Sequence, residues 1–321
     1  MSGEIQPVPI GSPSFINAPR IERLDQLEAD IAIIGVPYGV PYGVEGAKQR
    51  SGESTRTVRA ASVRFARYLT HYDVDFGGEI FAGRDVRVVD CGDVAMEAGA
   101  YDANFRATTG VIEAILQRDA IPIVLGGDHS IPIPVMQAYE DRGPVYVVQL
   151  DEHLDWRDEV GGVRLGLSSP MRRASEMSWV SGMAQIGLRA VGSARQAEFD
   201  AAVDYGSLLV TARELHRDGV DAVLERIPDG AQYYITFDAD ALDPSIAPGV
   251  GAPGFGGVSY YQATDLLRGI ARKGRVVGFD FVEVVPSLDT NDMTSLLAAR
   301  LTLNMIGALA HSGQIGRQAA E

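Results

Sequence analysis

Short apolar runs recur along the chain from residue 29 onward, and longer stretches with an apolar residue every three or four positions separate them. Eight runs are largely apolar: "DIAIIGVPY", "DVRVVDCGD", "IPIVLGG", "VYVVQLD", "MAQIGLR", "SLLVT", "QYYITFDAD" and "RVVGFDFVEV". Strands that are apolar on both sides are typical of a parallel sheet with helices on both faces. The pattern therefore predicts the α/β class, as a three-layer α/β/α domain whose parallel, doubly wound sheet has about eight strands.

The stretches between these runs are predicted to be helices. Residues 54–69 show the pattern, with four apolar side chains on one face: Val58, Ala61, Phe65 and Leu69. Ser54 or Thr55 is expected to cap this helix. Residues 1–28, rich in proline, glycine and serine, are interpreted as an N-terminal arm, and residues 29–321 as a single domain. Ligands of such a domain bind beyond the carboxyl ends of the strands.

The cysteine count and net charge bear on the cellular location and on the kinds of partner expected. The chain of 321 residues has one cysteine, Cys91, so no intrachain disulfide can form and a reducing, cytoplasmic location is predicted. Cys91 follows an apolar run and is interpreted as a small buried side chain. The formal net charge of −15 argues against a nucleic-acid partner or an anionic membrane, and it is compatible with a cationic ligand or metal ions.

A membrane role is not expected. The N-terminal residues show neither the basic nor the apolar region of a signal peptide, and no uninterrupted apolar run approaches the roughly 18 residues of a spanning helix. The helical stretch that begins at Met293 is expected to lie in the core or at a subunit contact, since its length and Arg300 argue against a membrane span.

Polar clusters follow three of the predicted strands: "GGDHS" at 126–130, "DEHLD" at 151–155 and "FDADALDP" at 237–244. Asp151, His153 and Asp155 stand two residues apart, as do Asp238 and Asp240, so in extended chain each set would project from one face. Asp243 and Pro244 are interpreted as ordinary turn residues. The three strand ends would thus bring four carboxylates and two imidazoles together.

Four carboxylates in one crevice would repel each other and destabilise the fold unless cations compensate them. Oxygen ligands with some imidazole suit Mn²⁺ best, with Ni²⁺, Co²⁺ or Fe²⁺ as alternatives, and the lack of cysteine disfavours a structural zinc. Two divalent ions would match the four negative charges, and such a pair is typical of hydrolytic enzymes. A single ion would leave a surplus of negative charge.

Two further charged residues bear on the substrate. The last apolar run leads to Glu283, with Asp280 as a second candidate, at the same rim as the other strand ends. Glu283 would favour a cation such as a planar guanidinium, unless it is only a surface or ion-paired residue. Arg157 follows the metal motif and would either bind a substrate carboxylate or pair with Asp158 or Glu159 at the surface.

These motifs resemble those of the ureohydrolase family, which includes arginase and agmatinase. The resemblance runs from "IIGVPYG" through "GGDHS", "DEHLD", "FDADALDPSIAPGVGAPGFGG" and "GFDFVEVVPSLD" to "TSLLAARL", and it is greater to the agmatinase branch. It implies an arginase-like fold, a binuclear and usually manganese centre, and homo-oligomers that are trimers or hexamers. Implied as ligands of one ion are His129, Asp151, Asp155 and Asp238. Implied as ligands of the other are Asp151, His153, Asp238 and Asp240.

The resemblance also implies roles for other residues. Glu283 would bind the guanidinium, Asp128 would support the metal ligands, and Asp155 or Asp240 could relay a proton to the leaving nitrogen. The implied reaction is hydrolysis of a small cationic guanidino compound, such as agmatine, 4-guanidinobutyrate or a related guanidine, to urea and an amine. A formiminoglutamase-like C–N hydrolase and a catalytically impaired subunit of a complex are the alternatives.

The chain departs from the family pattern at several positions. Relatives usually have alanine where this chain has Glu152, which we expect to face away from the metals and to find a basic or hydrogen-bonding partner. Leu167, in "LSSPMRRA", stands where the proton-handling histidine is usual, and Ser168 or Ser169 could order a water in its place. The substitutions at Val250 and Ala252 are expected to reshape the floor of the pocket.

Overall fold

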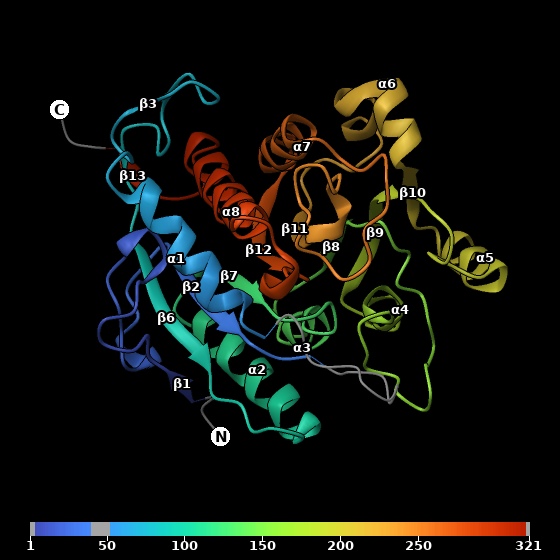
Figure 1. Cartoon of the computed structure of the whole chain (residues 1–321), viewed down its shortest axis with the longest axis horizontal. Helices are drawn as coiled ribbons and strands as arrows, with labels where there is room; N and C mark the ends of the chain where they lie inside the picture. The colour runs from blue at the N-terminus through green and yellow to red at the C-terminus, as the bar shows by residue number, and fades with distance from the viewer. Residues whose placement is uncertain (1–3, 40–51, 319–321) are drawn as a thin grey trace.

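The computed structural model describes residues 4–39 and 52–318, and its centre is a nine-stranded sheet in the order β1-β6-β2-β7-β12-β11-β8-β9-β10 (Figure 1). The strands are β1 (Ile5–Gln6), β2 (Ile31–Val36), β6 (Val88–Val94), β7 (Ile121–Gly126), β8 (Val145–Leu150), β9 (Val180–Leu188), β10 (Leu208–Thr211), β11 (Gln232–Asp238) and β12 (Arg275–Val282). All neighbours pair in parallel except β1, which runs antiparallel to β6. The eight predicted strands are confirmed, and the short edge strand β1 was not predicted.

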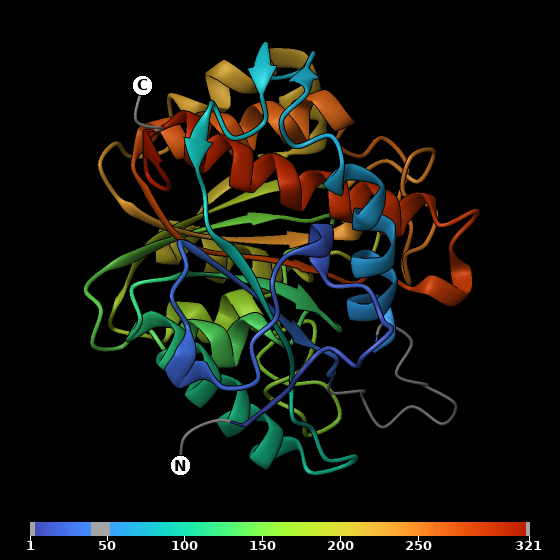
Figure 2. The same cartoon turned by 90° about the vertical axis from the view of Figure 1, so that its left-hand side faces the viewer.

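Helices cover both faces of the sheet (Figure 2). On one face lie α1 (Ser54–Ala66), α6 (Ala212–Leu224, interrupted at Gly219), α7 (Tyr260–Lys273) and α8 (Met293–His311). On the other lie α2 (Tyr101–Leu116), α3 (Pro132–Gln137), α4 (Pro170–Ser175) and α5 (Gln196–Tyr205). Smaller elements are β3 (Tyr72–Asp73), β4 (Gly78–Glu79), β5 (Arg84–Asp85), β13 (Arg317–Gln318) and the 3₁₀ helices η1 (Phe15–Asn17), η2 (Leu24–Gln26), η3 (Ala239–Ala241) and η4 (Pro286–Leu288).

The apolar strands form two cores, one on each side of the sheet. Along β2, Ile31 and Ile33 pack with the α1 and α8 side, whereas Ile34 and Val36 pack with the α2 and α3 side. Successive side chains of a strand point to opposite faces, so a strand between two helix layers must be apolar at every position. This requirement explains why the strands could be predicted from continuous apolar runs.

The start of α1 differs from the prediction. The helix begins at Ser54 and ends at Ala66, and its N-cap position is Glu53, which makes no side-chain capping bond. Ser54 and Thr55 are therefore not N-caps. The Ser54 hydroxyl instead donates a hydrogen bond to the carbonyl of Gly126 at the end of β7, and it joins the helix to the sheet.

Helix α8 is a core helix, as expected, although the length argument against a membrane span was wrong. Its 19 residues are long and apolar enough to cross a membrane by length and composition, but 78% of its most apolar window is buried inside the protein. It packs between α1 and α7. Arg300 pairs with Asp73 at 2.7 Å and with Asp75 at 3.3 Å.

The N-terminal segment forms the edge strand of the sheet and contributes side chains to the cores on both faces. It supplies β1 and buries the side chains of Phe15 and Leu27 in the two cores. Residues 1–3 lie outside the described part of the chain, and the division into an arm and a domain at residue 28 stays a prediction.

A buried arginine joins α1, β6 and this segment. Arg59 contacts both carboxylate oxygens of Asp90, from Nε at 2.9 Å and from Nη2 at 3.0 Å, and reaches Asp93 at 2.6 Å. Asp90 is fully buried and also accepts a hydrogen bond from the backbone N–H of Phe15. Planar guanidinium groups suit such bidentate contacts.

Replacing this arginine is expected to destabilise the fold strongly. Arg59→Met leaves the carboxylate of Asp90 buried without its cation, which should lower the free energy of unfolding by about 3–5 kcal/mol in urea titration. Arg56→Met on the same helix is the matched control, because Arg56 is exposed and its pairing with Glu53 should contribute less than about 1 kcal/mol. Equal effects of the two substitutions would contradict this account.

Candidate metal centre

The polar motifs meet at the carboxyl ends of four adjacent strands. Strands β7, β12, β11 and β8 are neighbours in the sheet, so the residues that follow them lie side by side. They line a cavity of about 290 Å³. Its lining residues include all the predicted ligands except Asp151: His129, His153, Asp155, Asp238, Asp240 and, from the other motif, Glu283. Asp151 is fully buried beneath them.

Tight turns, not extended strands, bring these side chains together. Strands β8 and β11 end at Leu150 and Asp238, and Asp240 lies in η3. In each motif an aspartate accepts the N–H of the residue two positions on. Asp128 accepts from Ser130 at 2.9 Å, Asp151 from His153 at 2.5 Å, and Asp238 from Asp240 at 2.8 Å. The predicted convergence is present, but the predicted cause, strand alternation, is wrong.

The first cluster surrounds the ring of His129. Its Nδ1 lies 2.9 Å from an oxygen of Asp151 and 3.0 Å from oxygens of Asp155 and Asp238. This nitrogen is buried and has no hydrogen-bond partner of good geometry within the described chain. A buried nitrogen about 3 Å from three carboxylate oxygens belongs to a group that could hold a metal ion.

The second cluster lies nearer the solvent. His153 Nδ1 is 3.4 Å from Asp151 and 3.2 Å from Asp240, and the His153 side chain is 29% exposed. Asp151 belongs to both clusters, as expected for a bridging ligand, whereas the second oxygen of Asp238 accepts the N–H of Asp240. The donors are carboxylate oxygens and imidazole nitrogens without sulfur, and they fit Mn²⁺ or a similar divalent ion.

The pKa values of these groups are shifted by burial and by their mutual charges. Burial raises the pKa of Asp155 to about 7, with a further contribution from the charge of Asp151. Burial and the neighbouring carboxylates raise the pKa of Asp238 well above its usual value. Burial lowers the pKa of His129, but Asp155 and the other two carboxylates outweigh burial, so that the pKa is raised. These shifts have the physical cause that the sequence predicted, which is like charges gathered away from water.

A chain of hydrogen bonds holds His129 from behind. Its Nε2 shares a hydrogen bond of 2.9 Å with the Thr236 hydroxyl, which donates to Asp280 at 2.8 Å. The Tyr234 hydroxyl donates to the other oxygen of Asp280. Asp280 was expected at the rim of the pocket, but it is fully buried inside β12, where burial raises its pKa to about 6. Polar residues in the otherwise apolar run "QYYITFD" were the signal for this chain.

A second support lies under Asp151 and was also missed. Gln149 Nε2 donates to Asp151 at 2.6 Å and to Asp155 at 3.3 Å. The side-chain amide of Gln185, on the neighbouring strand β9, donates to the side-chain oxygen Oε1 of Gln149 at 2.6 Å. Both amides are fully buried. A single glutamine in each of the apolar runs "VYVVQLD" and "MAQIGLR" was the available signal, because an unpartnered amide would be costly there.

Glu283 stands where the prediction placed it, at the wall of the cavity. Its carboxylate accepts the backbone N–H of His129 at 2.9 Å, and burial, aided by Asp128, raises its pKa to about 8. Its backbone is left-handed, with φ of 61°, and that of Asp155 is similar at 52°. Such conformations are strained for residues other than glycine and are concentrated at functional sites.

Two of the residues that depart from the family pattern, Leu167 and Ala252, lie in the cavity wall, whereas Val250, which was expected to reshape the pocket floor, does not line it. Of the two serines that follow Leu167, Ser168 lines the cavity, whereas Ser169, like Val250, is buried and does not. Arg157 also lines the cavity.

The charge partners of Arg157 and Glu152 bear on two further predictions. Arg157 pairs with Glu198 at 3.1 Å, so its expected surface pairing with Asp158 or Glu159 was wrong. Glu152 pairs with Arg189 at 3.1 Å, which confirms the expected basic partner.

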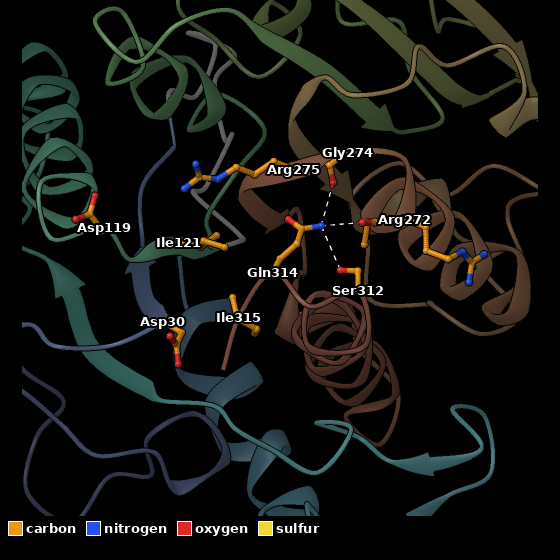
Figure 3. A pocket seen from close by; sticks show the side chains of 10 residues that line it. Asp30, Asp119, Ile121, Arg272, Gly274, Arg275, Ser312, Gln314 and Ile315 are labelled. Atoms are coloured by element: carbon orange, nitrogen blue, oxygen red, sulfur yellow. Dashed lines mark hydrogen bonds between the residues drawn. The ribbon is translucent and has the colours of Figure 1, made fainter. Parts of the chain in front are cut away.

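A larger cavity, of about 430 Å³, lies at the amino ends of the strands (Figure 3). At its centre the Gln314 amide donates to the carbonyls of Ala271 and Gly274, at 2.7 and 2.9 Å, where α7 ends (Figure 3). These contacts satisfy carbonyls at the end of α7. The smaller cavity contains the candidate metal ligands.

Comparison with known proteins agrees with this assignment. A family model described as the arginase family matches residues 29–307. A guanidinobutyrase of Pseudomonas aeruginosa is 32% identical over 93% of this chain and 92% of its own length. The mitochondrial agmatinase of Gallus gallus is 32% identical over 96% of this chain and 88% of its own. A solved structure of a hypothetical agmatinase from Burkholderia thailandensis has a TM-score of 0.80 and 29% identity, covering 95% of this chain and 92% of that one.

Metal binding is expected to stabilise the protein through these carboxylates. At about 100 times its dissociation constant, Mn²⁺ should add about 2.7 kcal/mol per site to the free energy of unfolding, measured on chelator-treated protein. Asp151→Asn should remove most of this gain. Asp243→Asn is the control, because Asp243 accepts the N–H of Ser245 and of Gly256 outside the cluster. If Mn²⁺ stabilises Asp151→Asn as much as the control, the assignment is wrong.

Proposed function

This chain belongs to the arginase family, and we propose that it is a metal-dependent hydrolase that releases urea from a small guanidino compound. The observation that carries the proposal is the single cavity in which two clusters of metal donors face Glu283. The four carboxylates and two imidazoles need cations, and Glu283 lies across the same cavity as a further acid.

Members of the arginase family are binuclear metal enzymes, typically with Mn²⁺, and we assign the same centre here. His129 and Asp155 would hold one ion, His153 and Asp240 the other, and Asp151 and Asp238 both. Bound divalent ions supply Lewis-acid chemistry and lower the pKa of water towards neutrality. The buried glutamine and threonine contacts behind the ligands keep the donors in place.

Glu283 orients the guanidinium. The N–H of His129 fixes one of its oxygens, and a planar guanidinium can take a bidentate contact with the carboxylate. Burial raises the pKa of Glu283 and so favours its protonated form. A bound guanidinium has the opposite effect, because a nearby positive charge stabilises the ionised carboxylate. The fixed plane of the substrate then presents the guanidinium carbon to the metal side of the cavity.

Proton transfer to the leaving nitrogen is assigned to Asp155 or Asp240. Both line the cavity, whereas Leu167 has no group that can carry a proton. Ser168 lies beside Leu167 in the same wall and is the residue placed to order a water there.

The charge of the outer wall favours a guanidino acid as the substrate. Among the described residues, those that line the cavity beyond the metal donors and Glu283 are Arg157, Leu167, Ser168, Gly192, Ser193, Gly251 and Ala252, and of these Arg157 alone is charged. A carboxylate at the far end of the substrate could bind the remaining N–H groups of Arg157, whereas the second cation of agmatine would face it. Similarity to a guanidinobutyrase and to an agmatinase at equal identity does not separate the two substrates.

The predicted cytoplasmic location, the trimeric or hexameric assembly and the absence of nucleic-acid or membrane partners stay predictions. A formiminoglutamase-like enzyme would be distinguished from the proposed hydrolase by its product, because it releases formamide in place of urea. The impaired-subunit alternative predicts no turnover with intact metal binding.

The first expectation is urea release by Mn²⁺-loaded protein. We expect the highest kcat/KM with 4-guanidinobutyrate or a shorter or longer guanidino acid, in a panel that also holds agmatine, arginine and guanidine. Glu283→Gln should lower kcat/KM about 100-fold or more, since it removes one charge of a buried pair. Absence of urea and formamide across the panel, with metal bound, would count against the hydrolase and for the impaired subunit.

The second expectation concerns Arg157. Arg157→Met should raise KM for a guanidino acid about 10- to 100-fold, the equivalent of one lost charged hydrogen bond, and should leave agmatine unchanged or better bound. Arg164→Met is the control, because Arg164 is 53% exposed and pairs with Asp158 outside the cavity. If Arg157→Met weakens both substrates equally, Arg157 does not select the carboxylate.

A further inference from the structure

A buried ion pair lies directly behind the second metal cluster. Glu152 and Arg189 are 3.1 Å apart, and their side chains are only 6% and 8% exposed. Glu152 is the residue between the ligands Asp151 and His153, at the position where the family resemblance leads one to expect alanine.

Arg189 contacts backbone from three separate segments. Its guanidinium donates to the carbonyl of Gly187 at 3.1 Å, to that of Asp240 at 2.6 Å and to that of Gly254 at 3.0 Å. Weaker contacts reach Ala241 and Leu242 at 3.3 and 3.4 Å. Carbonyl dipoles surround the cation, and Glu152 provides the opposite full charge.

The pair is connected to Asp240 from both sides. The backbone N–H of Glu152 donates to the Asp240 carboxylate at 3.3 Å, while Arg189 holds the Asp240 carbonyl. The carbonyl of Glu152 also accepts the hydroxyl of Ser193 at 3.1 Å, and Ser193 lines the cavity. A metal donor and a wall residue are thus held by one buried residue.

Gly254 shows how closely the wall fits the pair. A Cβ at Gly254 would lie 2.1–2.3 Å from the carboxylate atoms of Glu152, and its three nearest atoms all belong to that carboxylate. Gly251 and Ala252, just before it, line the cavity. The Glu152 carboxylate therefore fills the space that a side chain at position 254 would need.

We propose that the Glu152–Arg189 ion pair is a positioning device that holds Asp240 and the 251–254 wall in register with the second metal cluster. The geometry assigns it an effect on metal affinity, through the backbone of Asp240, and an effect on substrate binding, through the wall. The second effect rests on the proposed function. The first does not, because metal binding is measured without substrate.

The test is calorimetric titration of Mn²⁺ into chelator-treated protein. Asp240→Asn first identifies which binding event depends on Asp240. Glu152→Gln is nearly isosteric and should weaken that same event about 10- to 100-fold while the other event changes less than about threefold. Wild-type affinity for both events in Glu152→Gln, or equal weakening of both, would overturn the proposal.

A double-mutant experiment tests whether the Glu152 carboxylate links Gly254 to the metal site. Gly254→Ala should weaken the Asp240-dependent event in the wild-type background, because the new methyl group displaces the Glu152 carboxylate. In the Glu152→Ala background the same substitution should have no further effect, since the space is vacant. If Gly254→Ala acts equally in both backgrounds, the Glu152 carboxylate does not link the wall to the metal site.

A control substitution at another ion-paired arginine distinguishes a specific effect on metal binding from a general loss of stability. Arg300→Met removes another largely buried, ion-paired arginine, whose side chain is 19% exposed, and Arg300 does not line the cavity. It should lower the unfolding midpoint without changing either Mn²⁺ event. If Arg300→Met changes Mn²⁺ binding as Glu152→Gln does, the effect is general loss of stability and the proposal fails. A protein that shows the metal effects but hydrolyses no guanidino compound would retain this inference and refute the proposed function.

Discussion

Repulsion between carboxylates at adjoining strand ends is the constraint around which the structure is organised. Asp151, Asp155, Asp238 and Asp240 are all buried or nearly so, and burial raises the pKa of three of them. The sheet order makes this crowding unavoidable, because β8 and β11 are neighbours and both end in an acidic motif. The imidazoles of His129 and His153 face these carboxylates, buried glutamine amides donate hydrogen bonds to them, and the cluster could hold metal ions.

Local turns orient the polar side chains of the site, and the sheet positions the turns relative to one another. Three aspartate turns set the local direction of the side chains, while the sheet sets the distance between the motifs. Polar side chains inside β8, β9, β11 and β12 then fix the rings and carboxylates from below. Binding and catalytic groups of α/β domains are carried by loops that a rigid scaffold positions, and this protein follows that division of labour.

Features that depend on the spacing of residues along the chain could be predicted from the sequence. Contacts between residues far apart in the sequence could not. The eight parallel strands followed from continuous apolar runs, because both faces of the sheet are covered. The three motifs predicted that six polar side chains would converge. The strand alternation from which this was argued is absent, because Asp151 forms a turn and the backbone of Asp155 is left-handed. Asp280 was misplaced because nothing local reveals that Thr236 and Tyr234, 44 and 46 residues away, face it. Glu152 was expected to find a partner, but the partner could be named only once the sheet brought Arg189 beside it.

The contact between His129 and Glu283 has a consequence for how the protein matures. These residues are 154 positions apart, and the donors between them come from strands that pair only when the sheet is nearly complete. Loop closure over such separations is slow, and contact order of this kind places the site late in folding. The six polar side chains of the site are therefore brought together only by a sheet that is already largely paired, so a change that loosens the pairing of the central strands would disperse the site even if it lies far from it.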